Sequence, residues 1–313
     1  MLANMLIATR QVAILFIMAL VGVISDKVGW FSESTAKKCT DILFYVITPA
    51  KILESFFTLE YSKETLKGLF IAIGAGLLAH AAAALGAGLF FNKTPPEKKA
   101  VYKYACVYGN CGYMGLPLVD AVVGSEGVFY CSAFVISFQI FTFTHGVWLM
   151  TRDSEEGKKA INLKKLILNP GVLPVFVGLP VFISGIKLPG IISTPVSSIA
   201  HMLSPLAMLI FGAYIAHTDF RSVFRNPRIF GVALFKLFAM PLAMRVALHF
   251  TGVTGALATT LLIDCATPPA NNTAMFAAKY DKDTALGSQI VAVVSILSIF
   301  TLPFMIALGG MYV

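Results

Sequence analysis

Two hydrophobic segments of this sequence, residues 104–122 and 257–278, are interrupted by residues that break or weaken a helix. The interruptions comprise Gly109, Asn110, Gly112, Gly115 and Pro117 in the first segment, and Asp264, Thr267, Pro268, Pro269, Asn271 and Asn272 in the second. Within a membrane, an interrupted helix leaves backbone groups that only surrounding protein or a substrate-lined cavity can satisfy. Paired interruptions at corresponding positions of two halves are typical of the binding site of a secondary transporter. The pair therefore predicts a membrane carrier.

Composition supports a membrane location. Hydrophobic residues make up 57% of the chain and charged residues only 13%, and the mean hydropathy is +0.80, unlike a soluble domain. We expect an all-α polytopic membrane protein with about ten transmembrane helices. The apolar stretches are residues 12–25, 39–57, 67–91, 101–123, 127–150, 166–186, 194–216, 229–250, 255–278 and 285–312.

The placement of positive charge predicts the orientation. A net charge of +8 is compatible with nucleic-acid binding. However, the links after the odd-numbered spans, counted with Lys103 at the start of the fourth span, hold about 17 Lys and Arg, whereas the other side holds four. This asymmetry follows the positive-inside rule. We therefore expect no nucleic-acid partner, a multi-pass protein of the inner (plasma) membrane in contact with its lipids, and both termini extracytoplasmic. The first span has no cleavage site for a signal peptidase, so we expect it to be retained.

An internal duplication is suggested at an offset of 156 residues. At this offset Gly22 matches Gly178, Gly29 matches Gly185, and Pro49 matches Pro205. An odd number of spans in each repeat would make the two repeats inverted. The predicted organisation is a five-helix repeat at 1–151, a cytoplasmic link at 152–165 and an inverted five-helix repeat at 166–313, with broken helices 4 and 9 crossing.

The interruptions carry the predicted binding site. Free N–H groups at a helix N-terminus favour an anion and free carbonyls at a C-terminus favour a cation, and neutral amides and hydroxyls suit a carboxylate. Simple helix kinks are the alternative interpretation. The candidate substrate-binding residues are Asn110, Cys111, Gly112, Gly115, Pro117, Thr267, Pro268, Pro269, Asn271, Asn272 and Lys51.

Ionisable side chains inside apolar spans are energetically costly and commonly functional, and three of them are candidates for a role in transport. Asp264 is a candidate for coupling to H+ or Na+, or a cap of the half-helix that follows it. Lys51 is a candidate partner of a substrate carboxylate, unless its stem lets it reach the membrane surface. His80 is a candidate proton relay or a packed polar group. Lys236 and Arg245 are expected to reach toward lipid phosphates.

Other functional classes find little support in the sequence. No nucleophile with a base, no carboxylate pair and no spacing of metal ligands appears, so we expect neither an enzyme nor a metal site nor a cofactor. The cysteines, among them Cys111 and Cys265 at corresponding places in the two broken segments, are expected to be free thiols. A membrane sensor that binds a ligand without moving it remains an alternative, and a homodimer is compatible with the apolar spans.

The motif Asn110-Cys-Gly112-Tyr-Met-Gly115-Leu-Pro117 resembles a stretch of the auxin efflux carrier family, and Pro268-Pro269-Ala270 resembles the ninth span of that family. The resemblance covers nearly the whole chain. It implies the fold of the bile acid, arsenite and riboflavin transporter superfamily, with a scaffold, a transport domain and elevator-type alternating access. It also implies a small organic anion as substrate, such as malonate, malate or an auxin-like acid. The chain resembles the compact bacterial members, and a sodium-coupled organic anion symporter is the rival reading.

Overall fold

The computed structural model describes residues 2–152, 170–217, 226–309. Up to Arg152 the helices are α1 (Leu2–Lys27), α2 (Glu33–Ile42), η1 (Leu43–Ile47), α3 (Thr48–Thr58), α4 (Lys63–Leu89), α5 (Pro96–Val107), η2 (Cys111–Gly115), α6 (Leu116–Val122), α7 (Ser125–Phe141), η3 (Thr142–Gly146) and α8 (Val147–Thr151). The later helices are α10 (Leu173–Ser184), α11 (Gly190–Ala200), α12 (Leu203–Ala216), α14 (Arg228–Leu234), η5 (Phe235–Ala239), α15 (Met240–Thr251), α16 (Gly255–Ala266), α17 (Asn272–Lys279) and α18 (Thr284–Gly309).

The described residues contain helices and no strand, as expected for a protein that must satisfy its backbone within the membrane. Helices long and apolar enough to cross a membrane cover residues 63–89, 125–151, 190–216, 228–251 and 284–307, and shorter apolar helices cover 111–122, 173–184 and 255–266. The expected polytopic all-α membrane protein is thereby confirmed. The inverted repeat stays a prediction, and the expected link at 152–165 lies, beyond Arg152, outside the described residues.

Local sequence explains several helix ends. The Ser62 hydroxyl accepts a hydrogen bond from the N–H of Thr65 at 3.0 Å and so caps the start of α4. Gly185 ends α10 with φ +64°, in the left-handed region that a residue without Cβ adopts readily. Pro96 occupies the first turn of α5, where its missing N–H leaves no bond unmade.

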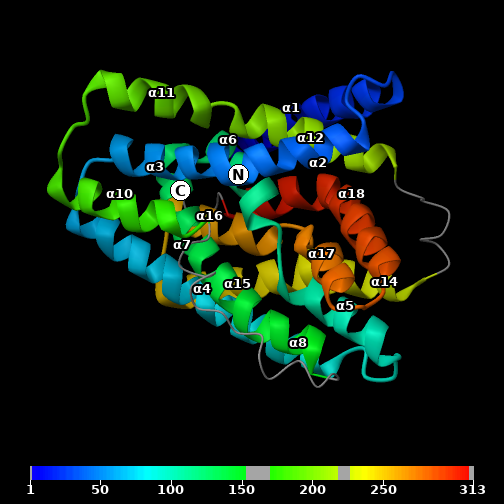
Figure 1. The fold of residues 1–313 in the computed structure, drawn as a ribbon. Helices are drawn as coiled ribbons and strands as arrows, with labels where there is room; N and C mark the ends of the chain where they lie inside the picture. Colours follow the sequence, from blue (N-terminus) through cyan, green and yellow to red (C-terminus); the bar gives the residue numbers. More distant parts are fainter. Residues whose placement is uncertain (1, 153–169, 218–225, 310–313) are drawn as a thin grey trace.

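The helices pack as two groups (Figure 1). The first layer comprises α1, α2, α3, α10, α11 and α12, with α1 against α12 and α3 against α10 and α11. The second layer comprises α4 to α8 and α14 to α18, with α4 against α7, and α16 against α7, α15 and α18. Contacts of α3 with α7 and of α1 with α6 and α18 join the layers.

Close approach of α1 and α12 holds the first layer together. A Cβ at Gly212 would strike the carbonyl oxygen of Ala19, and one at Gly22 would strike the carbonyl oxygen of Leu209. At one end of the same pair, His217 Nε2 lies 2.8 Å from an Asp26 carboxylate oxygen. Small residues allow such close approach of helix backbones within membranes.

Candidate functional site: the crossing of two broken helices

The two interrupted segments meet through their backbones. The N–H of Asn110 donates to the carbonyl oxygen of Pro268 at 2.7 Å, and the N–H of Ala270 donates to that of Tyr108 at 2.9 Å. These bonds form an isolated antiparallel bridge between Gly109 and Pro269. We call this region, residues 108–110 with 267–271, the crossing. Each interruption thus satisfies part of the other's exposed backbone.

Proline chemistry explains the break in the second segment. Neither Pro268 nor Pro269 can donate a backbone hydrogen bond, and a residue before proline favours extended backbone. Thr267 accordingly has φ −61° and ψ 141°, which ends α16. Its hydroxyl donates to the carbonyl oxygen of Asp264 at 2.7 Å, so a carbonyl in the last turn of the helix keeps a partner.

Asn110 begins the helix that continues after the first break. Its carboxamide oxygen accepts from the N–H of Tyr113 at 3.3 Å, and its carbonyl accepts from Met114 and Gly115. The Asn110 side chain is buried. Its amide nitrogen makes no hydrogen bond with any of the described residues. That nitrogen is therefore available to donate a hydrogen bond.

Three cavities lead to or adjoin Asn110. The largest of the three, here called the vestibule, has a volume of about 430 Å³ and lies between α2, α12, α17 and α18. A small cavity continues from it and reaches Asn110 through shared lining by Thr40, Tyr113 and Asn271. A third cavity also touches Asn110 and Tyr113; its further lining is Phe44, Thr48, Gly109, Gly112, Val135, Phe138, Gln139, Gly171, Ala270 and Asn272. The crossing is therefore bordered by two small cavities between the two layers, of about 20 and 30 Å³, and the first of them adjoins the vestibule.

Most of the predicted binding residues lie at or beside this crossing. Thr267, Pro268, Pro269 and Asn271 belong to the crossing itself, and Gly112 and Asn272 line the third cavity. Cys111 opens the helix after Asn110, Gly115 packs against Asp264, and Pro117 lies in the first turn of α6.

Asp264 lies buried behind the crossing, with a relative exposure of 1%. One carboxylate oxygen, Oδ1, accepts from the Cys131 thiol at 3.2 Å and lies 3.0 Å from the place a Cβ would take on Gly115. The other, Oδ2, has no hydrogen-bond partner among the described residues. A buried carboxylate oxygen without a hydrogen-bond partner is energetically costly, so this position of Asp264 needs an explanation.

Lys51 is held by carboxylates. Its ammonium lies 3.0 Å from Glu54 Oε2 and 2.9 Å from Asp120 Oδ1. Lys51 and Glu54 are on α3 in the first layer, whereas Asp120 is on α6 in the second. The structure therefore places Lys51 in an ion triad that joins the layers, one helical turn beyond Thr48 of the third cavity.

His80 is buried in an aromatic setting. Its Nδ1 lies 2.7 Å from the carbonyl oxygen of Gly76, one turn earlier in α4. Its ring packs against Phe134 and Phe141, with ring centroids 5.2 and 5.5 Å away. This is the environment of a packed polar side chain whose backbone partner lies in its own helix.

Three further polar residues lie beside the crossing, two of which the sequence argument passed over and one of which it assigned to the lipid surface. Thr48 and Gln139 are buried and line the third cavity. Lys236, expected at the lipid surface, is only 4% exposed, and its Nζ lies 2.8 Å from the place a Cβ would take on Gly109. The expectation for Lys236 was wrong, because its helix directs it inward. Its position eight residues after Arg228, roughly 12 Å along the helix, could have indicated burial.

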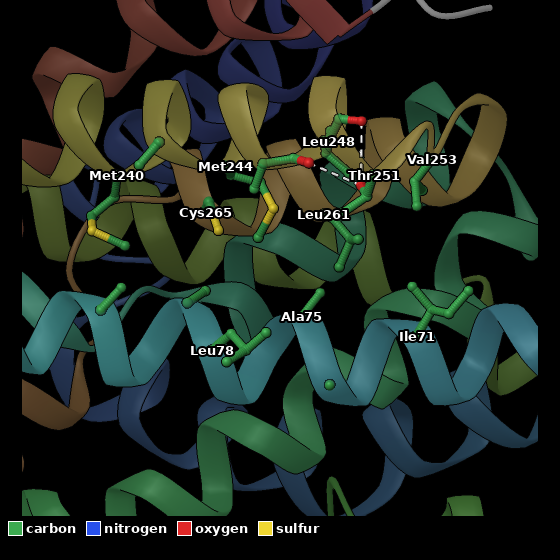
Figure 2. Close-up of a pocket in the computed structure, with 15 residues that line it drawn as sticks. Ile71, Ala75, Leu78, Met240, Met244, Leu248, Thr251, Val253, Leu261 and Cys265 are labelled. Atoms are coloured by element: carbon green, nitrogen blue, oxygen red, sulfur yellow. Dashed lines mark hydrogen bonds between the residues drawn. The ribbon is translucent and has the colours of Figure 1, made fainter.

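A further cavity, of about 530 Å³, lies away from these polar groups (Figure 2). Side chains of α4, including Ile71, Ala75 and Leu78, face Met244 and Leu248 of α15 across it. Among the described residues that line it, the only hydroxyl is that of Thr251, which already donates to carbonyl oxygens of its own helix. A carboxylate would lose its hydration there without gaining partners, so this groove does not suit an organic anion.

Comparison with known proteins identifies the family of this chain. A family model described as "Membrane transport protein" matches residues 7–306. An uncharacterised transporter of Methanocaldococcus jannaschii is 24% identical over 307 residues, which cover 93% of this chain and 95% of that protein. The chain belongs to the membrane transport protein family, the family of the auxin efflux carriers that its two interrupted segments resemble.

Proposed function

We propose that this protein is a secondary active transporter or facilitator of a small organic anion, a mono- or dicarboxylate, which binds at the crossing. The observation that carries the proposal is the backbone bridge between Gly109 and Pro269, directly beside the cavities that reach Asn110. Family membership establishes a membrane transporter; the substrate class and mechanism are inferred from the site.

An anion is favoured by the donors that the crossing offers. The helix that starts at Cys111 runs to Val122, and its first N–H groups have no carbonyl one turn earlier to bind. They carry partial positive charge. The Asn110 amide nitrogen adds a neutral donor, and Asn271 and Asn272 line adjacent cavities. Together these donors can bind a carboxylate without forming a permanent ion pair, which suits a ligand that must also leave.

The vestibule gives the anion an aqueous route. It adjoins His217 at the end of α12, and positive charge in the following link, at Arg221 and Arg225, predicts that this end faces the cytoplasm. We infer a protein of the inner (plasma) membrane with extracytoplasmic termini and a site open toward the cytoplasm. The basic link would attract anions toward the opening.

Alternating access is proposed to be elevator-like. Both halves of the crossing belong to the second layer, whereas α12 of the first layer closes one wall of the vestibule. Movement of the second layer along the first would carry the crossing toward the opposite side. The ion pair of Lys51 with Asp120 spans the two layers and would have to separate during that movement. Two inverted repeats would make the inward and outward arrangements equivalent.

Asp264 is the preferred coupling residue. Its Oδ2 lacks a partner and it lies directly behind the crossing, so its proton occupancy and the ligand can influence each other. His80 is the weaker candidate because its Nδ1 and ring are engaged within α4 and α7. Lys51 is not favoured as a ligand for the anion, because its two carboxylate partners would repel a third.

A thermal-shift screen tests the proposal. The detergent-purified protein is heated with malonate, malate, monocarboxylates, auxin and bile acids, each with and without Na+, because a ligand that binds only the folded state raises Tm. We expect stabilisation by a small carboxylate without any requirement for Na+, and its loss in Asn110→Asp. Stabilisation that requires Na+ would favour the sodium symporter. An absence of stabilisation by every acid would contradict the proposal.

A further inference from the structure

Lys236 is a buried cation beside the crossing. It lies in η5, within the continuous helix from Arg228 to Thr251, and is 4% exposed. It lines neither the vestibule nor the two smaller cavities at Asn110. A lysine in this position cannot reach the membrane surface as those at helix ends do, so its charge must be balanced within the protein.

The ammonium lies directly against the bridge. A Cβ on Gly109 would lie 2.8 Å from Lys236 Nζ and 2.6 Å from Thr267 Oγ1, so both atoms approach the same point of the bridge backbone. A methyl group at position 109 would therefore fit only if the side chains of Lys236 and Thr267 moved. The breaks expose carbonyl oxygens whose partial negative charge favours a cation at this place.

No carboxylate touches this ammonium. Among the described residues Lys236 forms neither a hydrogen bond nor an ion pair. Asp264 is the one carboxylate whose charge acts on it appreciably, and its Oδ2 also lacks a partner. The other titratable groups around the amine are His80 on α4 and the thiols of Cys106, Cys111 and Cys265. An amine and a carboxyl group are thus both buried beside the crossing, without direct contact between them among the described residues.

We propose that the Lys236 ammonium is a built-in cation, which takes the place at the crossing that a bound Na+ would take in a cation-coupled carrier. With Asp264 it keeps the region behind the crossing nearly neutral, while its positive charge favours an anion in front. This inference rests on the proposed function, because a built-in cation would explain why the proposed anion binds without Na+. Its test needs no substrate.

The experiment measures Tm of detergent-purified protein in NaCl, KCl and choline chloride at equal ionic strength, with no organic acid present. The wild type is expected to have the same Tm in all three salts. Lys236→Met removes the charge but keeps most of the volume, and leaves Asp264 facing a vacant cation position. We expect its Tm to rise by several degrees as Na+ is added, with saturation. The double variant Lys236→Met with Asp264→Asn should lose that response.

Two results would overturn the inference. One is a saturable Na+ shift in the wild type, which would show that the ammonium does not replace the ion. The other is a folded Lys236→Met protein whose Tm does not distinguish the salts. If Lys236→Met does not fold, Lys236→Gln is used instead, because it also removes the charge but keeps a polar end. Na+ is then expected to restore the folding and monodispersity of the Lys236→Gln protein. Failure of Na+ to rescue both variants would count against the proposal, whereas transport results would leave it unaffected.

Discussion

The N–H of Asn110 donates to the carbonyl oxygen of Pro268 across 2.7 Å, although 158 positions separate the two residues in the sequence. This bond lets two helices stop in the interior of a membrane protein without leaving all their backbone groups unpaired. It also holds the two helix breaks side by side. The Asn110 amide and the first N–H groups of the following helix can therefore donate to a ligand at this place. The following predictions test what depends on that arrangement.

Gly109→Ala should destabilise the crossing. The added methyl group would overlap Lys236 Nζ and Thr267 Oγ1, and overpacking of this kind costs about 1–3 kcal/mol. Gly112→Ala is the matched control, since a Cβ there meets no atom within 4 Å; its cost should be near zero. Denaturant unfolding in detergent measures both. Equal losses of unfolding free energy in the two variants would show that the close approach at Gly109 has no energetic weight.

Asn110→Asp should abolish binding of the organic anion while retaining the fold. The aspartate keeps an acceptor for the N–H of Tyr113, whereas Asn110→Ala removes this cap and should cost about 1 kcal/mol. The new negative charge repels a carboxylate at the crossing. Asn92→Asp adds the same charge at an exposed site and should bind normally. Titration calorimetry with the stabilising acid checks this; undiminished affinity in Asn110→Asp would exclude the crossing as the site.

Asp120→Asn should alter movement more than stability. In this variant Lys51 keeps its ion pair with Glu54 at 3.0 Å and can still donate to the asparagine oxygen. Because Asp120 is also partly exposed, the free energy of unfolding should fall by no more than about 1 kcal/mol. Lys51→Met, in contrast, leaves Glu54 buried and unpaired and should cost about 3–5 kcal/mol.

The transport rate of Asp120→Asn is expected to change several-fold, because the lost ion pair joins the two layers. Asp283→Asn is the control, as it removes a partner of Lys98 at 3.9 Å within the second layer. A rate in Asp120→Asn equal to that of the control would argue that the Lys51 triad does not resist the movement.

Gly212→Val should disrupt the first layer. Its side chain would collide with the carbonyl oxygen of Ala19 on α1, and a packed backbone can only respond by separating the helices. We expect a loss of more than about 2 kcal/mol, measured as the free energy of unfolding. Gly88→Ala in α4, where a Cβ meets nothing within 4 Å, should leave stability unchanged or raise it by about 0.5–1 kcal/mol. A similar outcome for both variants would contradict close packing of α1 on α12.

The membrane fold was predictable because its signals are local. Long apolar runs, and glycine and proline breaks near Asn110 and Pro268, can be read from the sequence without knowledge of neighbours. The ion pairs of Lys51 with Glu54 and Asp120 follow from the same general rule, because charges inside apolar spans need partners.

The face that each helix turns toward the protein interior could not be predicted from the sequence. Helices that are apolar on all sides lack a polar stripe that would distinguish the lipid face from the interior. Lys236 could therefore be assigned to the surface although it lies at Gly109. Gln139 and Thr48 were missed for the same reason, because they belong to the site only through contacts with segments remote in sequence.

The most direct test of the account is counterflow in proteoliposomes. Vesicles loaded with the acid that stabilises the protein are diluted into a trace of the same acid in labelled form, in Na+-free buffer. We predict that vesicles with the wild type accumulate label transiently, that those with Asn92→Asp do the same, and that those with Asn110→Asp behave as empty vesicles. Binding of the acid without any counterflow would contradict transport and favour a ligand sensor, and equal counterflow in Asn110→Asp would contradict the crossing as the site.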